Sequence, residues 1–417
     1  MFWHEKLSSG PISSISFTLA SDKIFGDLDI PELLVATKNC KIHLICRPGS
    51  DLKSKLVNEK GRKSTEIPTV IQILEGQALH IRAMAARPAH AHFAVAGDSG
   101  LIQIWNYLTK SLVTSKDCRS ANAIQSHKYD PDAAIHCLQY SKSGKTLAVG
   151  FANGNVRFMD ANKLEDLLQT VYTANIGHKI TNVPITCIEF SAAGNICAAA
   201  DAGFVVSVFQ KTSVKAAADI QDLDDTHGVK STSASRTAKR RIEWAVLGRT
   251  KVHFGPIISL LFPNVGDDEV IILNSISSDR HIAEYNLTTS TVTGGLVVVS
   301  IKQLEQIYRP TVALFVDQPN QAHPEQFITT FNTNSKVRSY AQKTKLCRKT
   351  VLGPTLGALV TSAQLLNLPD DNIRVAAFAT RDKVIGLMKI PADGNPFNNT
   401  GVIGHPGEAY YHSKQGL

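Results

Sequence analysis

The stretch Asp98-Ser99-Gly100-Leu101-Ile102-Gln103-Ile104-Trp105-Asn106 decides the fold. It begins with a tight turn and continues as an alternating strand that ends near a tryptophan. Asn153-Gly154-Asn155-Val156-Arg157-Phe158-Met159-Asp160 has the same spacing, with Met159 in place of the tryptophan. A pattern that returns along a chain indicates repeated supersecondary units, so further copies are expected.

Five further copies of this turn and strand occur, at residues 39–45, 201–209, 279–286, 334–340 and 382–387. Two short apolar segments precede each copy. The segment directly before the turn lies at 33–36, 93–96, 146–149, 196–199, 270–273, 326–329 and 374–378. The segment before that one lies at 12–17, 78–83, 135–140, 185–190, 257–262, 312–316 and 359–365. A fourth segment follows most copies, as at 111–115, 167–172, 242–247 and 295–301. Short strands in fours with Asx and Gly turns are typical of propeller blades. The sequence therefore predicts an all-β, WD40-type β-propeller with about seven recognisable blades.

Each copy has one position equivalent to the tryptophan, occupied by Ile45, Trp105, Met159, Phe209, Tyr285, Tyr340 and Leu387. Consecutive positions lie 47 to 76 residues apart. This exceeds the roughly 40–45 residues of a compact WD40 unit, and the surplus falls largely in charged stretches. We expect the aromatic side chains at this position to pack against the neighbouring blade.

Two stretches carry most of the net positive charge. The chain has 44 Lys and Arg against 36 Asp and Glu, a net charge of +8. Residues 47–68 hold six basic and three acidic side chains, and residues 211–251 hold nine basic and five acidic side chains. Both lose hydrophobic periodicity. We therefore predict a propeller over residues 1–406 with charged insertions at 47–68 and 211–251, and an irregular tail over residues 407–417.

The second stretch ends in a basic run, Lys239-Arg240-Arg241. We predict these three residues as partner-binding, because a basic loop can dock on an acidic surface. The alternative is a solvated loop that keeps a sheet protein soluble, which is the commoner role of a charge run.

The sequence contains no recognisable catalytic or metal pattern. Ser143-Gly144-Lys145-Thr146 resembles the end of a phosphate-binding loop, but Gln139 stands where that loop needs glycine, so we predict a β-turn. His90 and His92 have no third ligand at a readable spacing. Gly177-His178 looks like the pair that precedes the first strand of a WD unit, and His178 has no nucleophile to serve. We expect no enzyme, no cofactor and no metal.

The longest apolar runs, at 257–262 and 296–299, are far shorter than the roughly 18 residues of a membrane helix. The N-terminus has no secretory pattern. We expect a soluble, intracellular chain without a membrane partner. The seven cysteines are scattered, which predicts free thiols that pack as small apolar side chains.

The last two blades carry a more specific signature. Cys347-Arg348-Lys349-Thr350-Val351-Leu352-Gly353-Pro354-Thr355 is followed by Asp382-Lys383-Val384, by Ile390-Pro391-Ala392-Asp393-Gly394-Asn395-Pro396 and by Gly404-His405-Pro406. In order and spacing these segments resemble the second propeller of the WD-repeat cilia- and flagella-associated protein 251 family. Over residues 10–345 the resemblance is mainly the shared blade pattern.

That resemblance implies a non-enzymatic scaffold in the axoneme of motile cilia. The family is part of the calmodulin- and spoke-associated complex at the base of radial spokes, where it helps to anchor spokes to doublet microtubules and to regulate motility. The implied partners are other subunits of that complex, radial-spoke proteins, calmodulin through the complex, and the tubulin lattice. Outside the axoneme, the expected location is the cytoplasm.

The chain departs from the family after Gly404-His405-Pro406, where the family has another blade. Residues 407–417 lack apolar alternation, so we expect a ring that is incomplete at its C-terminus and exposes sheet edges. The alternative function is a generic WD-repeat interaction protein of cytoplasm or nucleus that binds an acidic partner or RNA through basic loops. Few aromatic residues lie among the basic ones, so nucleic acid is the less favoured partner.

Overall fold

The structure is a computed structural model of the 417-residue chain. It describes residues 3–6, 11–18, 32–38, 41–46, 69–75, 79–126, 128–167, 178–179, 183–215, 240–263, 270–304, 307–316, 326–352, 358–368 and 373–390. No helix in this part of the chain is long and apolar enough to cross a membrane.

The described residues form seven four-stranded antiparallel sheets, which we number as blades from the N-terminus. Blade 1 contains β2 (Ile12–Thr18), β3 (Glu32–Thr37), β4 (Lys41–Cys46) and β5 (Thr69–Glu75). Blade 2 contains β6 (Ile81–Ala86), β7 (His92–Gly97), β8 (Leu101–Asn106) and β9 (Ser111–Asp117). Blade 3 contains β10 (Ile135–Tyr140), β11 (Thr146–Phe151), β12 (Asn155–Asp160) and β13 (His178–Lys179). Blade 4 contains β14 (Ile185–Phe190), β15 (Ile196–Asp201), β16 (Val205–Lys215) and β17 (Arg240–Lys251).

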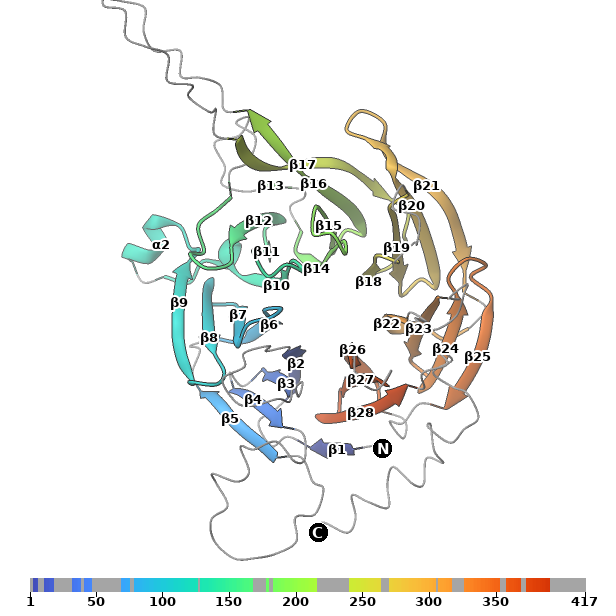
Figure 1. The fold of residues 1–417 in the computed structure, drawn as a ribbon, viewed down its shortest axis with the longest axis horizontal. Coiled ribbons are helices and arrows are strands. Elements are labelled where there is room, and N and C mark those ends of the chain that lie inside the picture. Colours follow the sequence, from blue (N-terminus) through green and yellow to red (C-terminus); the bar gives the residue numbers. More distant parts are fainter. Residues whose placement is uncertain are drawn as a thin grey trace, which may run out of the picture.

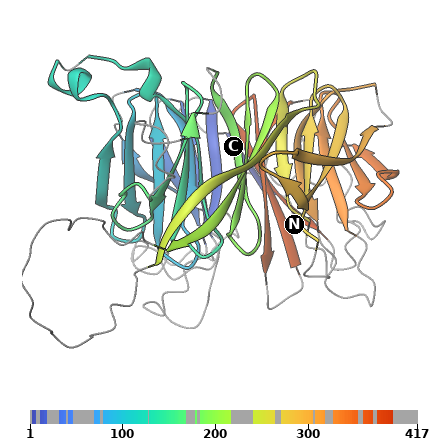
Figure 2. The same ribbon diagram turned by 90° about the horizontal axis from the view of Figure 1, so that it is seen from above.

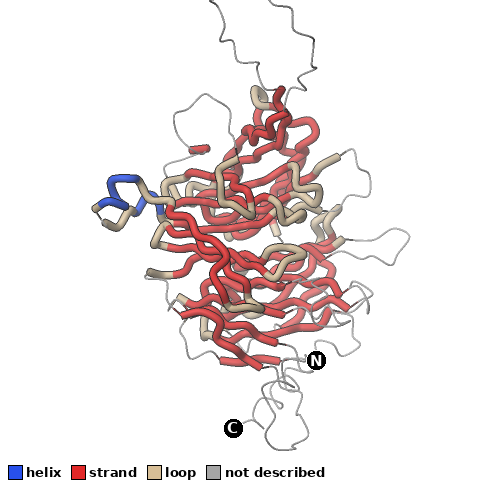
Figure 3. Tube along the Cα trace, turned by 60° about the vertical axis from the view of Figure 1, so that its left-hand side comes forward, coloured by secondary structure: helices blue, strands red, loops and turns tan. Residues whose placement is uncertain are grey.

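Blade 5 contains β18 (Ile257–Leu261), β19 (Ile272–Ser277), β20 (His281–Thr291) and β21 (Gly295–Gln303). Blade 6 contains β22 (Pro310–Val316), β23 (Phe327–Asn332), β24 (Lys336–Ala341) and β25 (Cys347–Leu352). Blade 7 contains β26 (Val360–Leu368), β27 (Ile373–Thr380), β28 (Val384–Ile390) and β1 (Trp3–Lys6). Two short helices, α2 (Ala121–Gln125) and η2 (Pro131–Ala133), lie between blades 2 and 3. Figure 3 shows α2 at the side of the molecule.

The blades surround a common axis, with the first strand of each blade innermost (Figure 1). Seen from the side, the sheets stand upright around that axis (Figure 2). The predicted seven-bladed all-β propeller is therefore confirmed.

Seven hydrophobic clusters hold the ring together, one at each interface between neighbouring blades. Tyr285 of blade 5, for example, packs with Val208 of blade 4, and Tyr340 of blade 6 packs with Ile276 of blade 5. Both tyrosines are fully buried. The predicted role of the aromatic position is confirmed there, because a flat sheet face becomes a core only when the next blade covers it.

The first strand of each blade is bulged at its entry. The register against the second strand shifts within the first three residues in every blade, as between Ile135 and Cys137 or between Ile185 and Cys187. A bulge bends a strand and increases its twist. Its sevenfold recurrence gives the inner strands a common bend at one end of the ring.

The N-terminal strand closes the ring. β1 pairs with β28 along its length, from Trp3 opposite Leu387 to Lys6 opposite Val384. It supplies the fourth strand of blade 7, so the predicted incomplete ring is wrong for the described residues. Local sequence patterns do not reveal this pairing, because the two strands lie at opposite ends of the chain.

Blade 3 differs from the prediction in its fourth strand. That strand was expected at residues 167–172, but the structure has β13 at His178–Lys179, paired with Asn155 and Val156 of β12. Beside the predicted segment, Met159 and Asp166 form only an isolated bridge. His178 therefore lies in the fourth strand of blade 3 and, as predicted, ahead of a first strand, because β14 of blade 4 is the next element in the chain. Residues 168–177 lie outside the described residues.

Candidate functional site: a basic hairpin and the turn face of the ring

The predicted basic run falls at the far end of a long hairpin. Arg240 and Arg241 are the first residues of β17 and pair with Lys215 and Val214 of β16, while Lys239 lies outside the described residues. Figure 1 shows both strands extending beyond the outer edge of the ring. The charged stretch 211–251 thus contains the end of one strand and all of another, whereas the stretch 47–68 lies outside the described residues.

The hairpin is anchored between its two ends by aromatic side chains. Trp244 of β17 is fully buried and stacks on Phe158 of blade 3, with ring centroids 4.2 Å apart. Phe190 and Phe209 complete this cluster between blades 3 and 4. The two strands are paired from Val205–Lys251 to Lys215–Arg240, which fixes the register of the basic residues on the backbone. Because Arg240 and Arg241 are basic and lie at the far end of the hairpin, charge complementarity favours an acidic partner there.

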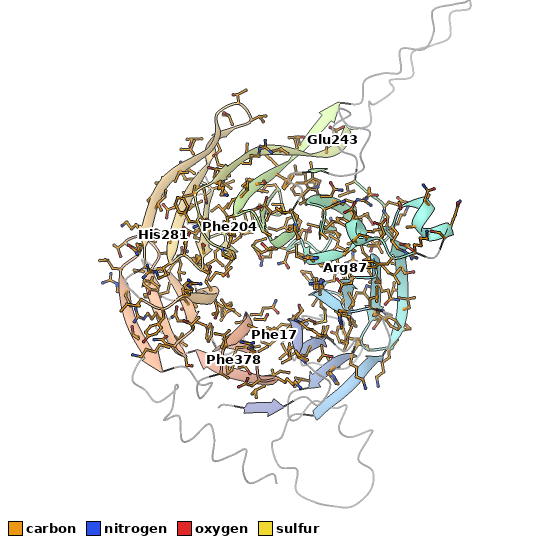
Figure 4. The ribbon with its side chains drawn as sticks, turned by 180° about the vertical axis from the view of Figure 1, so that it is seen from behind. Phe17, Arg87, Phe204, Glu243, His281 and Phe378 are labelled. Atoms are coloured by element: carbon orange, nitrogen blue, oxygen red, sulfur yellow. The ribbon has the colours of Figure 1, made fainter. Side chains whose placement is uncertain are left out.

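One face of the ring carries the turns between second and third strands and the segments that lead into the first strands; we call it the turn face. In six blades the residue just before the third strand has a positive φ: Gly100, Gly154, Phe204, Arg280, Ser335 and Lys383. Only two of these six are glycine, the residue that adopts this conformation without strain. Bulky residues rarely adopt it, and such positions are concentrated at functional sites. Figure 4 marks Phe204 and, one residue after Arg280, His281.

Blade 5 contains a buried polar network beneath this face. Nε2 of His253 lies 2.6 Å from Oγ of Ser275, which lies 2.9 Å from the hydroxyl of Tyr285. Nδ1 of His253 lies 3.4 Å from Oδ2 of Asp279, and that carboxylate accepts the backbone N–H groups of Phe254 and His281. The order carboxylate, imidazole and hydroxyl is that of a nucleophilic triad.

This network links the segment before β18 to β19 and β20 and so stabilises the blade. It is not arranged for catalysis, because the hydroxyl of Ser275 cannot reach a substrate. Ser275 and Tyr285 are fully buried, His253 is 1% exposed, and the serine hydroxyl is already engaged with both neighbours. The repeat pattern predicts Asp279 and Tyr285 as the turn and closing residues. His253 does not stand out in the sequence, because a valine, and not a glycine, precedes this histidine.

Protonation of His253 should destabilise the fold. Burial lowers the pKa of His253 below its ordinary value of 6.5, against the opposing influence of Asp279. The unfolded chain then binds more protons, so this contribution to stability is present above about pH 6.5 and is lost as the pH falls through the folded-state pKa. In a His253→Gln variant, the difference in free energy of unfolding from wild type should narrow between about pH 7 and pH 5. A constant difference in denaturant titrations across that range would contradict the assignment.

The other sequence motifs have structural roles. Gly144 has a φ of 67° in the turn between β10 and β11, which confirms the predicted β-turn. His90 and His92 stack with ring centroids 5.9 Å apart. Within the described ranges, no three His, Cys, Asp or Glu side chains come together as metal ligands would. The five cysteines whose side chains the structure describes are free thiols, and burial raises the pKa of Cys118 to about 11.

Comparison with known proteins gives two results. Residues 36–235 match a β-propeller family model described as nucleolar protein 10-like, N-terminal domain. The chain is also similar to cilia- and flagella-associated protein 251 from Pongo abelii, with 26% identity over 97% of the chain and 31% of the relative. The protein of that name from Tetrahymena thermophila is 24% identical over 90% of the chain and 36% of the relative. The one from Chlamydomonas reinhardtii is 24% identical over 72% of the chain and 31% of the relative.

The alignments span only about a third of the length of these three relatives. The relatives nevertheless come from a mammal, a ciliate and an alga. The alignments also reach well beyond the segments at residues 347–406 that carry the resemblance in the sequence. The resemblance to the cilia- and flagella-associated protein 251 family is thus confirmed over most of the chain, and the chain is related to that family.

Proposed function

We propose that this chain is a non-enzymatic propeller scaffold of the motile cilium or flagellum, located in the axoneme. The observation that carries the proposal is the similarity to cilia- and flagella-associated protein 251 over 97% of the chain. The propeller supports a non-enzymatic role, because the network of His253, Ser275 and Asp279, which most resembles a catalytic triad, is buried and stabilises blade 5. The proposed role is to anchor radial spokes to doublet microtubules and thereby to help regulate bending.

The proposed partners are proteins. They are the other subunits of the calmodulin- and spoke-associated complex, radial-spoke proteins, calmodulin through that complex, and the tubulin lattice. Tagging the endogenous protein, isolating cilia and extracting them with detergent tests the location. Retention in the detergent-resistant axoneme is expected, and absence of the tagged protein from cilia would overturn the proposal.

The basic hairpin is the proposed contact for an acidic partner. Replacing Lys239, Arg240 and Arg241 with Ser should lower the salt concentration that extracts the protein from axonemes, because screened charge contacts then hold it less firmly. Folding should be unchanged, since Trp244 still anchors the hairpin to blade 3. The matched control replaces three exposed lysines in other turns, Lys110, Lys163 and Lys343, and should extract like wild type. Equal extraction of both variants would show that the run is only solvated.

A second candidate function is binding of RNA or another acidic partner in the nucleus or cytoplasm. The match of residues 36–235 to a nucleolar protein 10-like domain supports it. Contacts to phosphates release counterions, so RNA affinity should then fall steeply as salt rises. Nuclear tagged protein together with such a salt dependence would favour this candidate over the ciliary scaffold.

A further inference from the structure

The turn face contains a pocket of about 540 Å³ between blades 5 and 6. It is lined by the segment before β18, the turn between β19 and β20, and the segment before β22. The lining residues are Phe254, Gly255, Pro256, Ser278, Asp279, Arg280, Ile307 and Arg309. Nothing in the proposed ciliary function requires this pocket, so it calls for a separate explanation.

Two large apolar side chains at this pocket are almost fully exposed. Phe254 is 87% exposed and Ile307 is 84% exposed, and the adjacent Tyr308 is 48% exposed. Apolar groups that are clustered and solvated, rather than scattered singly, mark interaction sites. They supply the aromatic and aliphatic anchors that typically contribute most of the binding energy.

The backbone that presents Phe254 is held firmly in place. Its N–H donates to Oδ2 of Asp279 at 2.8 Å, and the carbonyl of Gly255 accepts the Ser277 hydroxyl at 2.8 Å. Gly255 also lies so close to the turn that a Cβ there would sit 3.1 Å from the Asp279 nitrogen. A fixed backbone lowers the entropy lost on binding, so the exposed ring is presented in a preorganised position.

The charge that this pocket offers to a ligand is positive. Arg280 and Arg309 line it, whereas the one acidic lining residue, Asp279, directs its carboxylate to the N–H groups of Phe254 and His281 and lies beside two imidazoles. Arg280 has a φ of 73°, at a position where two other blades have glycine. Glycine adopts this conformation without strain, so an Arg280→Gly change would remove the guanidinium without disturbing the turn.

We propose that this pocket binds an acidic segment of a partner protein that carries an apolar side chain next to its carboxylates. Phe254 and Ile307 receive the apolar side chain, and Arg280 and Arg309 bind the carboxylates, for which the planar guanidinium fork is suited. Nucleic acid fits less well, since the pocket has two cations beside an apolar wall and not a basic track.

The test uses the full chain and a pool of synthetic peptides in which glutamates flank randomised apolar positions. Peptides from this pool should be enriched on the protein, whereas pools with lysine for glutamate, or serine for the apolar residues, should not. An Arg280→Gly variant should bind the enriched peptides about tenfold more weakly, the effect of one charge-assisted contact. Phe254→Ser should weaken binding at least as much.

Stability measurements separate this proposal from a structural role for the same residues. Arg280→Gly suits the positive φ, so its melting temperature should equal or exceed that of wild type. Lys383→Gly is the matched control, because Lys383 has a φ of 67° at the equivalent turn of blade 7 and does not line the pocket. It should leave binding unchanged.

Three results would overturn the proposal: no enrichment from the acidic pool, wild-type binding by Arg280→Gly or by Phe254→Ser, and preferential binding of an oligouridine strand with a steep salt dependence. The outcome is independent of ciliary location. A cytoplasmic protein that binds the peptides would refute the proposed function and leave the pocket assignment standing.

Discussion

Removal of residues 2–6 is expected to lower the melting temperature strongly and to promote aggregation. These residues include β1, whose four residues pair with β28 and complete blade 7. At about 1 kcal/mol for each backbone hydrogen bond, loss of this pairing should destabilise the ring by a few kcal/mol. The edge of β28 would then be open to pairing with other chains.

Thermal unfolding and light scattering of the truncated protein measure both effects. A synthetic peptide of residues 1–10, added in trans, should restore part of the lost stability, because an extended peptide can add a strand to an open sheet edge. A scrambled peptide of the same composition serves as its control. A truncated protein that melts like wild type would show that blade 7 is stable with three strands.

The second large effect is expected at a buried ion pair between blades 5 and 6. Nζ of Lys345 donates to Oε2 of Glu284 at 2.6 Å, to Oδ1 of Asn274 at 3.3 Å and to the carbonyl of Gln342. The Lys345 side chain is only 2% exposed. Glu284→Ala would leave the ammonium buried without its counter-charge, at an expected cost of about 3–5 kcal/mol in the free energy of unfolding.

A double-mutant cycle tests whether the pair itself is responsible. The same Glu284→Ala change should cost under about 1 kcal/mol in a Lys345→Gly background, since no buried charge then remains and glycine suits the φ of 58° at that position. The comparison pair is Lys116 with Asp166, between blades 2 and 3, whose side chains are 25% and 23% exposed. Asp166→Ala should cost about 1 kcal/mol or less. Equal costs for Glu284→Ala in both backgrounds would contradict the interpretation.

The sequence located the blades and the fourth strands predicted at 111–115, 242–247 and 295–301, but it misplaced the fourth strand of blade 3. The turn and third strand were predicted in all seven blades, because alternation and a Gly or Asx turn are local signals. Fourth strands are at the rim and have weaker apolar patterns; in blade 3 the strand begins eleven residues later than predicted, at His178 and not at Leu167. The outward reach of β16 and β17 was also unexpected, since 211–251 had lost its periodicity.

Among the candidate sites, too, the one that is a local run of residues was predicted, and those that depend on contacts between distant residues were not. The run Lys239-Arg240-Arg241 is visible as composition, and its contact role stays a prediction. His253, the Lys345 ion pair and the pocket at Phe254 were not found, because each combines residues from segments that are separated in sequence or lie in different blades. Exposure of Phe254 and Ile307 cannot be inferred from a sequence in which apolar residues usually predict a core.

The sequence by itself determined the repeating unit, the all-β class and the relationship to a ciliary family, because these depend on patterns within short segments. The tertiary structure alone decided that β1 closes the ring, that His253 meets Ser275 and Asp279, and that two arginines flank an apolar pocket. The physical reason is that ring closure and inter-blade contacts join residues far apart in the chain, and their geometry is set by how seven sheets pack around one axis.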